Sequence, residues 1–304
     1  MSFAGLKYYL SSPTHMFDFF ASRNMLNWMP DELFLKQKYK LVMGSKLDLD
    51  NPKTFNEKLQ WLKIHDRKPL YNTLVDKYEV RKYIAGIIGE RYLIPLVGGP
   101  WNSPDEIDFD ALPEQFVLKC THDSGGVVIC KDKSKLDIPA VKAKLNKHLK
   151  RNYYWTNREW PYKDVKPRII AEKYMEDESG GLTDYKVFCF DGEPKLLLMV
   201  TDRGSDEVTK RDFFDMDFNN LHFTNSAGPN SDKELKKPAS FKEMLQVATE
   251  LSAGMTHLRV DMYEAEGKVY VGELTLYDGG GLLALDPPEW NGILGTWIRL
   301  PECR

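Results

Sequence analysis

An arginine and two acidic residues near the end of the sequence stand in stretches that are otherwise apolar. Residues 259–281 predict two strands joined by a turn at residues 266–267, because apolar and β-branched residues flank a two-residue turn signal. Arg259 and Asp261 share one face of the first strand, and Glu273 lies on the second. Carboxylates among apolar residues are costly without a charged partner, and oxygen ligands suit magnesium. The pattern therefore predicts a magnesium site; the alternative is a solvated face that carries both acids by chance.

The two acids can share an ion only if both side chains point to one face of this hairpin. A regular two-residue turn would set Asp261 against Gly272 and turn Glu273 to the opposite face. The hairpin must therefore contain either a loop with an odd number of residues or a bulge in one strand. A three-residue loop at 266–268 would set Asp261 directly against Glu273, with Gly267 supplying the positive φ that such loops need.

A glycine-rich stretch between two predicted strands could bind phosphate. Residues 116–129 predict two short apolar strands with Ser124, Gly125 and Gly126 in the loop between them. Adjacent glycines allow several backbone N–H groups to point at one anion, and Lys119 at the end of the first strand would add positive charge. The stretch is not a Walker loop, because no Gly-Lys-Ser or Gly-Lys-Thr follows. An ordinary hairpin loop is the alternative.

A predicted helix supplies a second lysine. Asp76 can cap a helix whose apolar face is formed within residues 80–88 and which ends at Gly89. Lys77 lies in the first turn and points away from the apolar face. It could therefore face a ligand, although a solvated lysine is the simpler interpretation when the helix is considered alone.

The composition limits the classes of function. The chain has 304 residues, a formal net charge of −3 and no long basic run, which argues against nucleic acid as the main partner. Its four cysteines include no CxxC pair, and no apolar run approaches the roughly 18 residues of a membrane span. Because the first residues also lack the order of a signal peptide, we expect a soluble cytoplasmic protein. The aromatic N-terminal residues leave contact with the inner face of the membrane as an alternative.

Helices, strands and hairpins are intermixed, which indicates an α+β protein, and their order resembles the ATP-grasp fold. The resemblance implies two α+β lobes that clamp ATP together with Mg²⁺. On this basis residues 1–75 form a helical N-terminal region and residues 76–304 form the ATP-grasp domain. Its small lobe is expected at about 115–172 and its large lobe at about 173–304. The sequence departs from the family in showing only helices where a leading α/β lobe is expected.

The resemblance also assigns a nucleotide site. It implies two lysines that bind phosphate, a flexible glycine-rich loop, a hinge that receives adenine, and an acid that holds the ribose. The matching positions are Lys77, Lys119, Ser124, Gly125, Gly126, Glu172, Lys173, Met175 and Asp184.

Catalytic and metal-binding roles are implied in the same way. Arg259 and Lys119 match catalytic cations of the family, and Asp261 and Glu273 match its metal-binding acids. The family usually has Asn two residues after that Glu, whereas Thr275 stands here, so Thr275 is the uncertain third metal ligand. Candidates to hold the carboxylates of a substrate are Arg168, Lys186 and Arg203.

Four longer segments resemble one branch of the family, the teichuronopeptide-biosynthesis (TupA-like) proteins. The branch is associated with bacterial surface polysaccharides. The resemblance implies an ADP-forming ligase that joins a uronic-acid carboxylate to the amine of an amino acid through an acyl phosphate. Its partners would be a polysaccharide or its precursor and an amino acid. The segments are PKTFNEKLQWLKIHDRKPLY, KCTHDSGGVVICKDKS, KPRIIAEKYMEDESG and GELTLYDGGG.

Two other functions remain open from the residues alone. A sugar-nucleotide-dependent glycosyltransferase is suggested by Asp-x-Asp at residues 215–217, but residues 48–50 and 108–110 match that motif equally well. A non-catalytic carbohydrate-binding protein is suggested by the aromatic run at residues 153–160. Release of ADP that depends on both a uronic acid and an amine would separate the three functions.

Overall fold

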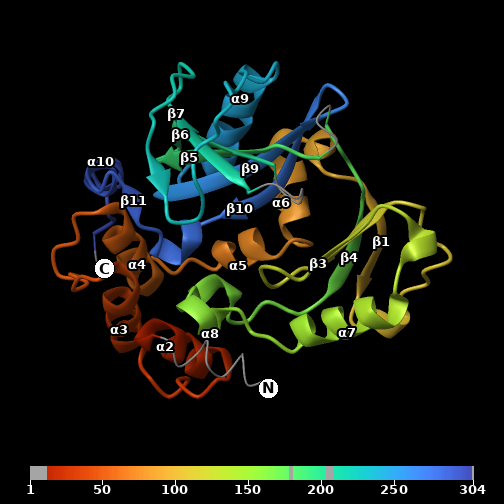
Figure 1. Ribbon diagram of the computed structural model, residues 1–304, viewed down its shortest axis with the longest axis horizontal. Coiled ribbons are helices and arrows are strands. Elements are labelled where there is room, and N and C mark those ends of the chain that lie inside the picture. The colour runs from red at the N-terminus through yellow and green to blue at the C-terminus, as the bar shows by residue number, and fades with distance from the viewer. Residues whose placement is uncertain (1–11, 178–180, 203–207, 303–304) are drawn as a thin grey trace.

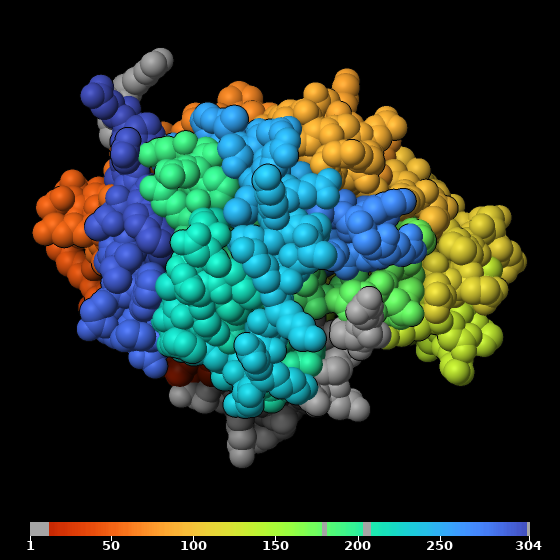
Figure 2. Space-filling model, turned by 90° about the horizontal axis from the view of Figure 1, so that it is seen from above, coloured from red at the N-terminus to blue at the C-terminus, as the bar shows by residue number. Residues whose placement is uncertain are grey.

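The computed structural model describes residues 12–177, 181–202 and 208–302. Its named strands form a four-stranded sheet, a five-stranded sheet and a two-stranded ribbon, all with antiparallel pairing. The two larger sheets lie in separate parts of the molecule, with α5 (Leu70–Val75) and α6 (Val80–Ile88) between them (Figure 1). Seen from above, the small lobe forms one end of an elongated body (Figure 2). This mixture of helices and antiparallel sheets confirms the predicted α+β class.

The small lobe is a four-stranded sheet with one helix packed on it. The strand order is β1-β4-β2-β3, and the buried apolar residues of β2 and β4 pack with Val141 and Leu145 of the helix α7. Because side chains alternate along a strand, Lys119 and Glu172 lie on the opposite face. The bounds are β1 Leu96–Trp101, β2 Phe116–Cys120, β3 Val127–Cys130, β4 Ile169–Lys173 and α7 Ile138–Leu149.

The large lobe is a five-stranded sheet in the order β10-β9-β5-β6-β7. The helix α9 packs against β5, β6 and β9, and Cys189 in β5 donates from Sγ to the Ala248 carbonyl of α9. Phe188, the preceding residue, points the other way and contacts Phe55 of α4. Asp184 and Lys186 of β5 and Arg259 and Asp261 of β9 share this second face. The bounds are β5 Asp184–Phe190, β6 Glu193–Thr201, β7 Lys210–Phe214, β9 His257–Ala265, β10 Lys268–Thr275 and α9 Phe241–Ser252.

The N-terminal helices share one apolar core with the large sheet. Phe34 of α3, Leu59 of α4 and Leu74 of α5 belong to the same buried cluster as Val260 of β9. Thr54 and Glu57 form a capping box at the start of α4. The division at residue 75 remains a prediction, although the core is continuous across it. These helices are α2 Pro13–Ser22, α3 Asp31–Met43 and α4 Phe55–His65.

Short elements complete the chain. The helix α8 lies between α7 and β4, and the ribbon of β8 and β11 connects the large sheet to α10. None of the helices in the described residues is long and apolar enough to cross a membrane. The bounds are α8 Tyr154–Asn157, β8 Thr224–Asn225, β11 Leu285–Asp286 and α10 Glu289–Trp297, with 3₁₀ turns at Glu90–Tyr92, Pro104–Glu106, Lys133–Lys135, Trp160–Tyr162 and Asp278–Gly281.

Candidate active site

The inner face of the small sheet carries a buried ion pair. Lys119 of β2 places Nζ 2.5 Å from Oε2 of Glu172 on β4, because Glu172 is paired in register with Val117, two residues before the lysine. Arg81 of α6 approaches the other carboxylate oxygen at 3.6 Å. Two residues predicted for separate roles, phosphate binding and adenine binding, are therefore direct neighbours.

Lys77 connects the glycine-rich loop to the large sheet. Its Nζ donates to the Asp123 carbonyl at 2.8 Å and lies 3.9 Å from Oε2 of Glu273. Its backbone N–H donates to the Thr121 carbonyl, so the start of α6 is tied to the loop from two directions. Lys77 and Glu273 were predicted from stretches almost 200 residues apart in the sequence, and the structure brings them together at the boundary between the lobes.

The glycine-rich loop holds its shape through side chains at both ends. Asp123 Oδ2 lies 2.5 Å from Nδ1 of His148 on α7. Gly125 has a φ of +94°, and a Cβ on Gly126 would lie 2.6 Å from Asp123 Oδ1, so neither position readily accepts a side chain. The loop exposes Ser124 and Gly125, whereas Gly126 is buried against Cys120 and Asp123.

The hairpin of β9 and β10 satisfies the geometric requirement with a bulge. The turn has two residues, because Ala265 pairs with Lys268, so the expected three-residue loop is wrong. The register shifts between Val271 and Glu273, which sets Glu273 directly against Asp261. The skipped residue is Gly272, whose Cβ would lie 2.6 Å from the ring of Tyr263. Asp261 and Glu273 therefore point to the same face of the hairpin, which is the condition for sharing one ion.

Arg259 stands at the centre of the acidic residues. Its Nε donates to Asp261 Oδ1 at 2.6 Å and its Nη2 to Asp261 Oδ2 at 2.7 Å. Nη2 also lies 3.1 Å from Oγ1 of Thr275 and 3.5 Å from Oε1 of Glu273. Nη1 donates to Asp278, in the 3₁₀ turn that follows β10. One guanidinium therefore contacts all three of the predicted metal ligands.

Lys186 supplies a second cation to this centre. It lies beside Asp261 in the register of β5 and β9 and donates to Asp261 Oδ2. Its Nζ is also 3.8 Å from Oδ1 of Asp184, which is buried. Lys186 and Asp184 were predicted for substrate and ribose binding, and these roles stay predictions; in this structure Lys186 lies between Asp261 and Asp184.

The balance of burial and nearby positive charge shifts the pKa values of the two acids in opposite directions. Burial alone would raise the pKa of Glu273, but Lys77, Lys186 and Arg259 lower it to about 2. Burial raises the pKa of Asp261, and Arg259 and Lys186 oppose that rise. Burial would lower the pKa of Arg259, but Asp261 and Asp278 raise it well above its usual value. Glu273 is therefore a carboxylate held in its ionised form.

The acidic residues fit a magnesium ion in donor type and charge. Asp261, Glu273 and Thr275 offer only oxygen, and the guanidinium of Arg259 already places positive charge where these oxygens converge. The Glu273 side chain is 43% exposed and accessible, whereas Asp261 would have to share an oxygen now held by Lys186 or Arg259. Within the described residues, no three His, Cys, Asp or Glu side chains form a ready-made metal cluster, so a bound phosphate would have to supply further oxygens.

Several predicted residues lie outside this centre. Arg168 forms ion pairs with Asp76 at 2.6 Å and Glu79 at 2.8 Å, beside the start of α6. Lys173 pairs with Glu266 at the turn of the β9–β10 hairpin. Met175 is buried in a small apolar cluster, and Arg203 lies outside the described residues. The roles predicted for these residues stay predictions.

The aromatic run at residues 152–162 reaches the centre, which the sequence did not indicate. Asn157 of α8 packs on Gly280, whose added Cβ would lie 2.6 Å from Asn157 Nδ2. Gly280 also accepts a hydrogen bond from Lys63 of α4 at 2.6 Å. The only indication of this contact in the sequence was Asp278 followed by three glycines. In the structure each of these glycines has a positive φ.

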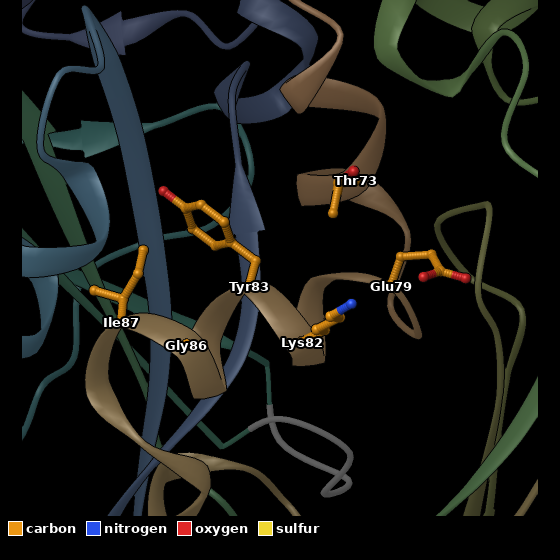
Figure 3. A pocket seen from close by; sticks show the side chains of 6 residues that line it. All are labelled: Thr73, Glu79, Lys82, Tyr83, Gly86 and Ile87. Atoms are coloured by element: carbon orange, nitrogen blue, oxygen red, sulfur yellow. The ribbon is translucent and has the colours of Figure 1, made fainter.

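A shallow hollow of about 530 Å³ lies on the outer side of α5 and α6 (Figure 3). The residues that line it include none of the predicted nucleotide or metal ligands. It therefore adds no residue to the candidate active site. The lining residues are Thr73, Glu79, Lys82, Tyr83, Gly86 and Ile87.

Three solved structures illustrate what the chain resembles in three dimensions. A D-alanine–D-alanine ligase from Bacillus anthracis complexed with ATP is 16% identical, with a TM-score of 0.39, over 67% of this chain and 54% of that one. An N5-carboxyaminoimidazole synthase from Aspergillus clavatus is 16% identical, with a TM-score of 0.38, over 71% and 46%. A biotin carboxylase domain from Hydrogenobacter thermophilus is 12% identical, with a TM-score of 0.43, over 89% and 53%. The chain spans about half the length of these structures.

The sequence itself identifies the family. A search of the curated proteins gave no match. The model of the TupA-like ATP-grasp family matches residues 57–299, which is most of the 304-residue chain and includes both charged faces described above. The chain therefore belongs to the TupA-like ATP-grasp family.

Proposed function

We propose that the chain is an ADP-forming ligase that joins a carboxylate to an amine through an acyl phosphate. The observation that carries this proposal is the position of Lys77, which links the glycine-rich loop to Glu273 across the boundary between the lobes. A cation at that point lies between a candidate phosphate loop and a candidate metal ligand. Membership of the ATP-grasp family supports ATP as the nucleotide.

The cations of the small lobe would bind the nucleotide. Lys77 and Lys119 would neutralise phosphate charge, and the backbone of Ser124 to Gly126 would donate N–H groups to the terminal phosphate. Glu172 holds Lys119 in place by their ion pair until the nucleotide binds. Lys173 and Met175 follow Glu172 on the strand that leads into the large lobe, where the family receives adenine.

In the first chemical step, a carboxylate oxygen of the substrate would attack the γ-phosphorus of ATP. The bond from that phosphorus to the β–γ bridging oxygen breaks, and ADP leaves with the bonding electrons. Arg259 would stabilise the charge that develops on the transferred phosphoryl group. Magnesium bound by Glu273 and Asp261, with Thr275 as a further oxygen, would neutralise phosphate charge in this step.

In the second step, a neutral amine nitrogen would attack the acyl carbon. The carbon–oxygen bond to phosphate breaks, phosphate leaves, and the nitrogen loses a proton to give an amide. An acyl phosphate is destroyed by water, so the glycine-rich loop must cover it until the amine arrives.

The substrate class is inferred from the family branch. A uronic acid within a bacterial surface polysaccharide, or its precursor, would supply the carboxylate, and an amino acid would supply the amine. Of the two predicted carboxylate-binding residues that the structure describes, Lys186 donates to Asp261 as Arg259 does, whereas Arg168 pairs with Asp76 and Glu79. Such a protein would work in the cytoplasm, where ATP is available.

Local hydrogen bonds account for the Asp-x-Asp motif on which the glycosyltransferase alternative rests. Each of the three Asp-x-Asp stretches caps its own turn: the first Asp accepts a backbone N–H from the residue two positions on. All three lie in exposed turns, and this local hydrogen bonding explains why the pattern recurs. The acceptors are Asp48, Asp108 and Asp215.

The proposal is tested by ADP release from the full chain. ATP and magnesium are supplied with D-glucuronate-containing oligosaccharides and each of the common amino acids, alone and in pairs. We expect ADP and phosphate in equal amounts only when both a carboxylate and an amine are present, and a product whose mass equals both substrates less one water. Transfer from a sugar nucleotide without ATP would instead support the glycosyltransferase.

A further inference from the structure

Glu159 is a buried carboxylate whose capacity to accept hydrogen bonds is almost unused. It is 5% exposed and follows the short helix α8. Among the described residues its side chain makes one hydrogen bond, a long one of 3.4 Å from Asn157 Nδ2, and no ion pair within 4.0 Å. A carboxylate can accept about four hydrogen bonds, and a buried one is costly unless they are made. This position therefore requires a partner that the chain does not supply.

The neighbouring cations direct their donors elsewhere. Lys63 donates its three N–H groups to Gln60 Oε1 at 2.9 Å and to the carbonyls of Asn157 and Gly280 at 3.0 and 2.6 Å. Lys38 donates to the Thr156 carbonyl and forms an ion pair with Asp18. These ammonium groups balance the charge of Glu159 from a distance, but their hydrogen bonds hold the backbone of α8 in place. They leave the carboxylate oxygens open.

Two tyrosines connect Glu159 to the catalytic centre. The rings of Tyr153 and Tyr162 pack edge to face with centroids 4.8 Å apart, and the backbone N–H of Tyr162 donates to the Glu159 carbonyl at 3.1 Å. Glu159, and then burial, raise the pKa of Tyr153, with a smaller contribution from Glu273. Burial, and then Glu159 and Glu273, raise the pKa of Tyr162. The space beside the two rings therefore lies in the negative field of both carboxylates.

We propose that Glu159 binds the ammonium group of the amine substrate beside Tyr153 and Tyr162, and accepts one proton from it to leave the neutral amine that attacks. An ammonium group supplies the N–H donors that the carboxylate lacks, and aromatic rings attract cations. The location suits the second step, because Asn157, which donates to Glu159, packs on Gly280 beside the Arg259–Asp278 pair. This inference rests on the ligase activity proposed above.

The subsite is tested by steady-state kinetics of Glu159→Gln in the full chain. ADP release is measured with ATP, a glucuronate-containing oligosaccharide and the most active amino acid of the panel. We expect KM for the amino acid to rise about 10- to 100-fold, as for the loss of one charge-assisted hydrogen bond, with KM for ATP and for the oligosaccharide unchanged. Hydroxylamine carries no charge at neutral pH, so its reaction with the acyl phosphate should keep its wild-type rate.

Two further variants separate binding from folding. Asp212→Asn removes another buried carboxylate, on the distant strand β7. Burial raises the pKa of this acid. We expect the variant to leave every KM unchanged. Glu159→Asp keeps the charge and should retain part of the affinity for the amino acid. This variant tests the subsite if Glu159→Gln destabilises the fold. A rise in KM for the oligosaccharide instead, or no change in KM for the amino acid, would overturn the subsite. If the wild-type chain releases no ADP with any pair, the ligase activity fails and the subsite falls with it.

Discussion

Two cations share one carboxylate on the inner face of the small lobe, whereas four carboxylates share two cations at the centre of the large lobe. On the small lobe, Lys119 and Arg81 both approach Glu172. On the large lobe, the carboxylates pair with Lys186 and Arg259 only through crowded contacts. These carboxylates are Asp184, Asp261, Glu273 and Asp278.

The opposite surpluses of charge indicate the sign of the charge that each lobe lacks. Buried charges are stable only when they are compensated, so a surplus marks the sign of a missing ligand. The small lobe is short of anions, which suits the phosphates of a nucleotide. The large lobe is short of cations, which suits a metal ion. Lys77 belongs to the small-lobe set by position, since it contacts the loop, but it reaches toward the large lobe through Glu273.

The largest expected effect comes from breaking the large-lobe centre at Asp261, one of its two most buried acids. Asp261 is 1% exposed and holds both Arg259 and Lys186. Asp261→Asn should abolish ADP release and lower the free energy of unfolding by about 3–5 kcal/mol, because two buried cations lose their partner. Urea unfolding and the ADP assay measure the two effects separately. An unchanged unfolding midpoint together with normal turnover would contradict the charge centre itself.

The second prediction separates the two acids of the hairpin. The Glu273 side chain is 43% exposed, so Glu273→Gln should change the free energy of unfolding by less than about 1 kcal/mol. Turnover should nevertheless fall by more than about 100-fold, because a ligand for magnesium is lost. Wild-type turnover with ordinary magnesium dependence would remove Glu273 from the site.

The hairpin illustrates how far the sequence predicts the site. Alternation of side chains along two strands was enough to require a bulge or an odd loop, and a bulge is present. The choice between them could not be made, because Glu266 and Gly267 both adopt a positive φ in the two-residue turn, and Glu gives little warning of that conformation. Gly272 allows the bulge because the ring of Tyr263 occupies the space of a side chain.

The N-terminal helices illustrate what a sequence pattern leaves out. The resemblance predicted a helical N-terminal region, but it contains no information about the partners of the polar side chains on these helices. Gln60 donates to the carbonyls of Gly280 and Gly281, more than 200 residues away, and Lys63 joins Asn157 to Gly280. A buried lysine at a helical position gives no local signal, so neither contact nor the role of Glu159 could be predicted.

The third prediction weakens the small-lobe surplus. Lys119→Ala should reduce ATP affinity about 10- to 100-fold, whereas Lys119→Arg should retain most of it, because the charge remains. Lys77→Ala should behave like Lys119→Ala if the loop and the large lobe close on the same phosphates. Titration calorimetry with ATP measures all three variants. Wild-type affinity in both alanine variants would show that these cations serve only the ion pairs seen here.

The smallest expected effect is a dependence of stability on pH that comes from Glu273. Its pKa is about 2 in the folded chain, below the ordinary value of 4.5, because Lys77, Lys186 and Arg259 outweigh the effect of burial. A lowered folded pKa stabilises the protein above the unfolded value, and this contribution is lost as the pH falls from 4.5 toward 2. Since the side chain is 43% exposed, solvent screening keeps the contribution below about 1 kcal/mol.

The effect is isolated by comparing the wild-type chain with Glu273→Gln. We expect the difference in free energy of unfolding between the two proteins to be constant above about pH 5 and to shrink toward more acidic pH, because the glutamate is protonated while the glutamine does not titrate. Urea unfolding at a series of pH values measures that difference directly. A difference that grows as the pH falls would mean that the folded chain favours the protonated acid, as burial without nearby cations would cause. The large-lobe centre would then lack the cationic field that sets its acids apart from Glu172 in the small lobe.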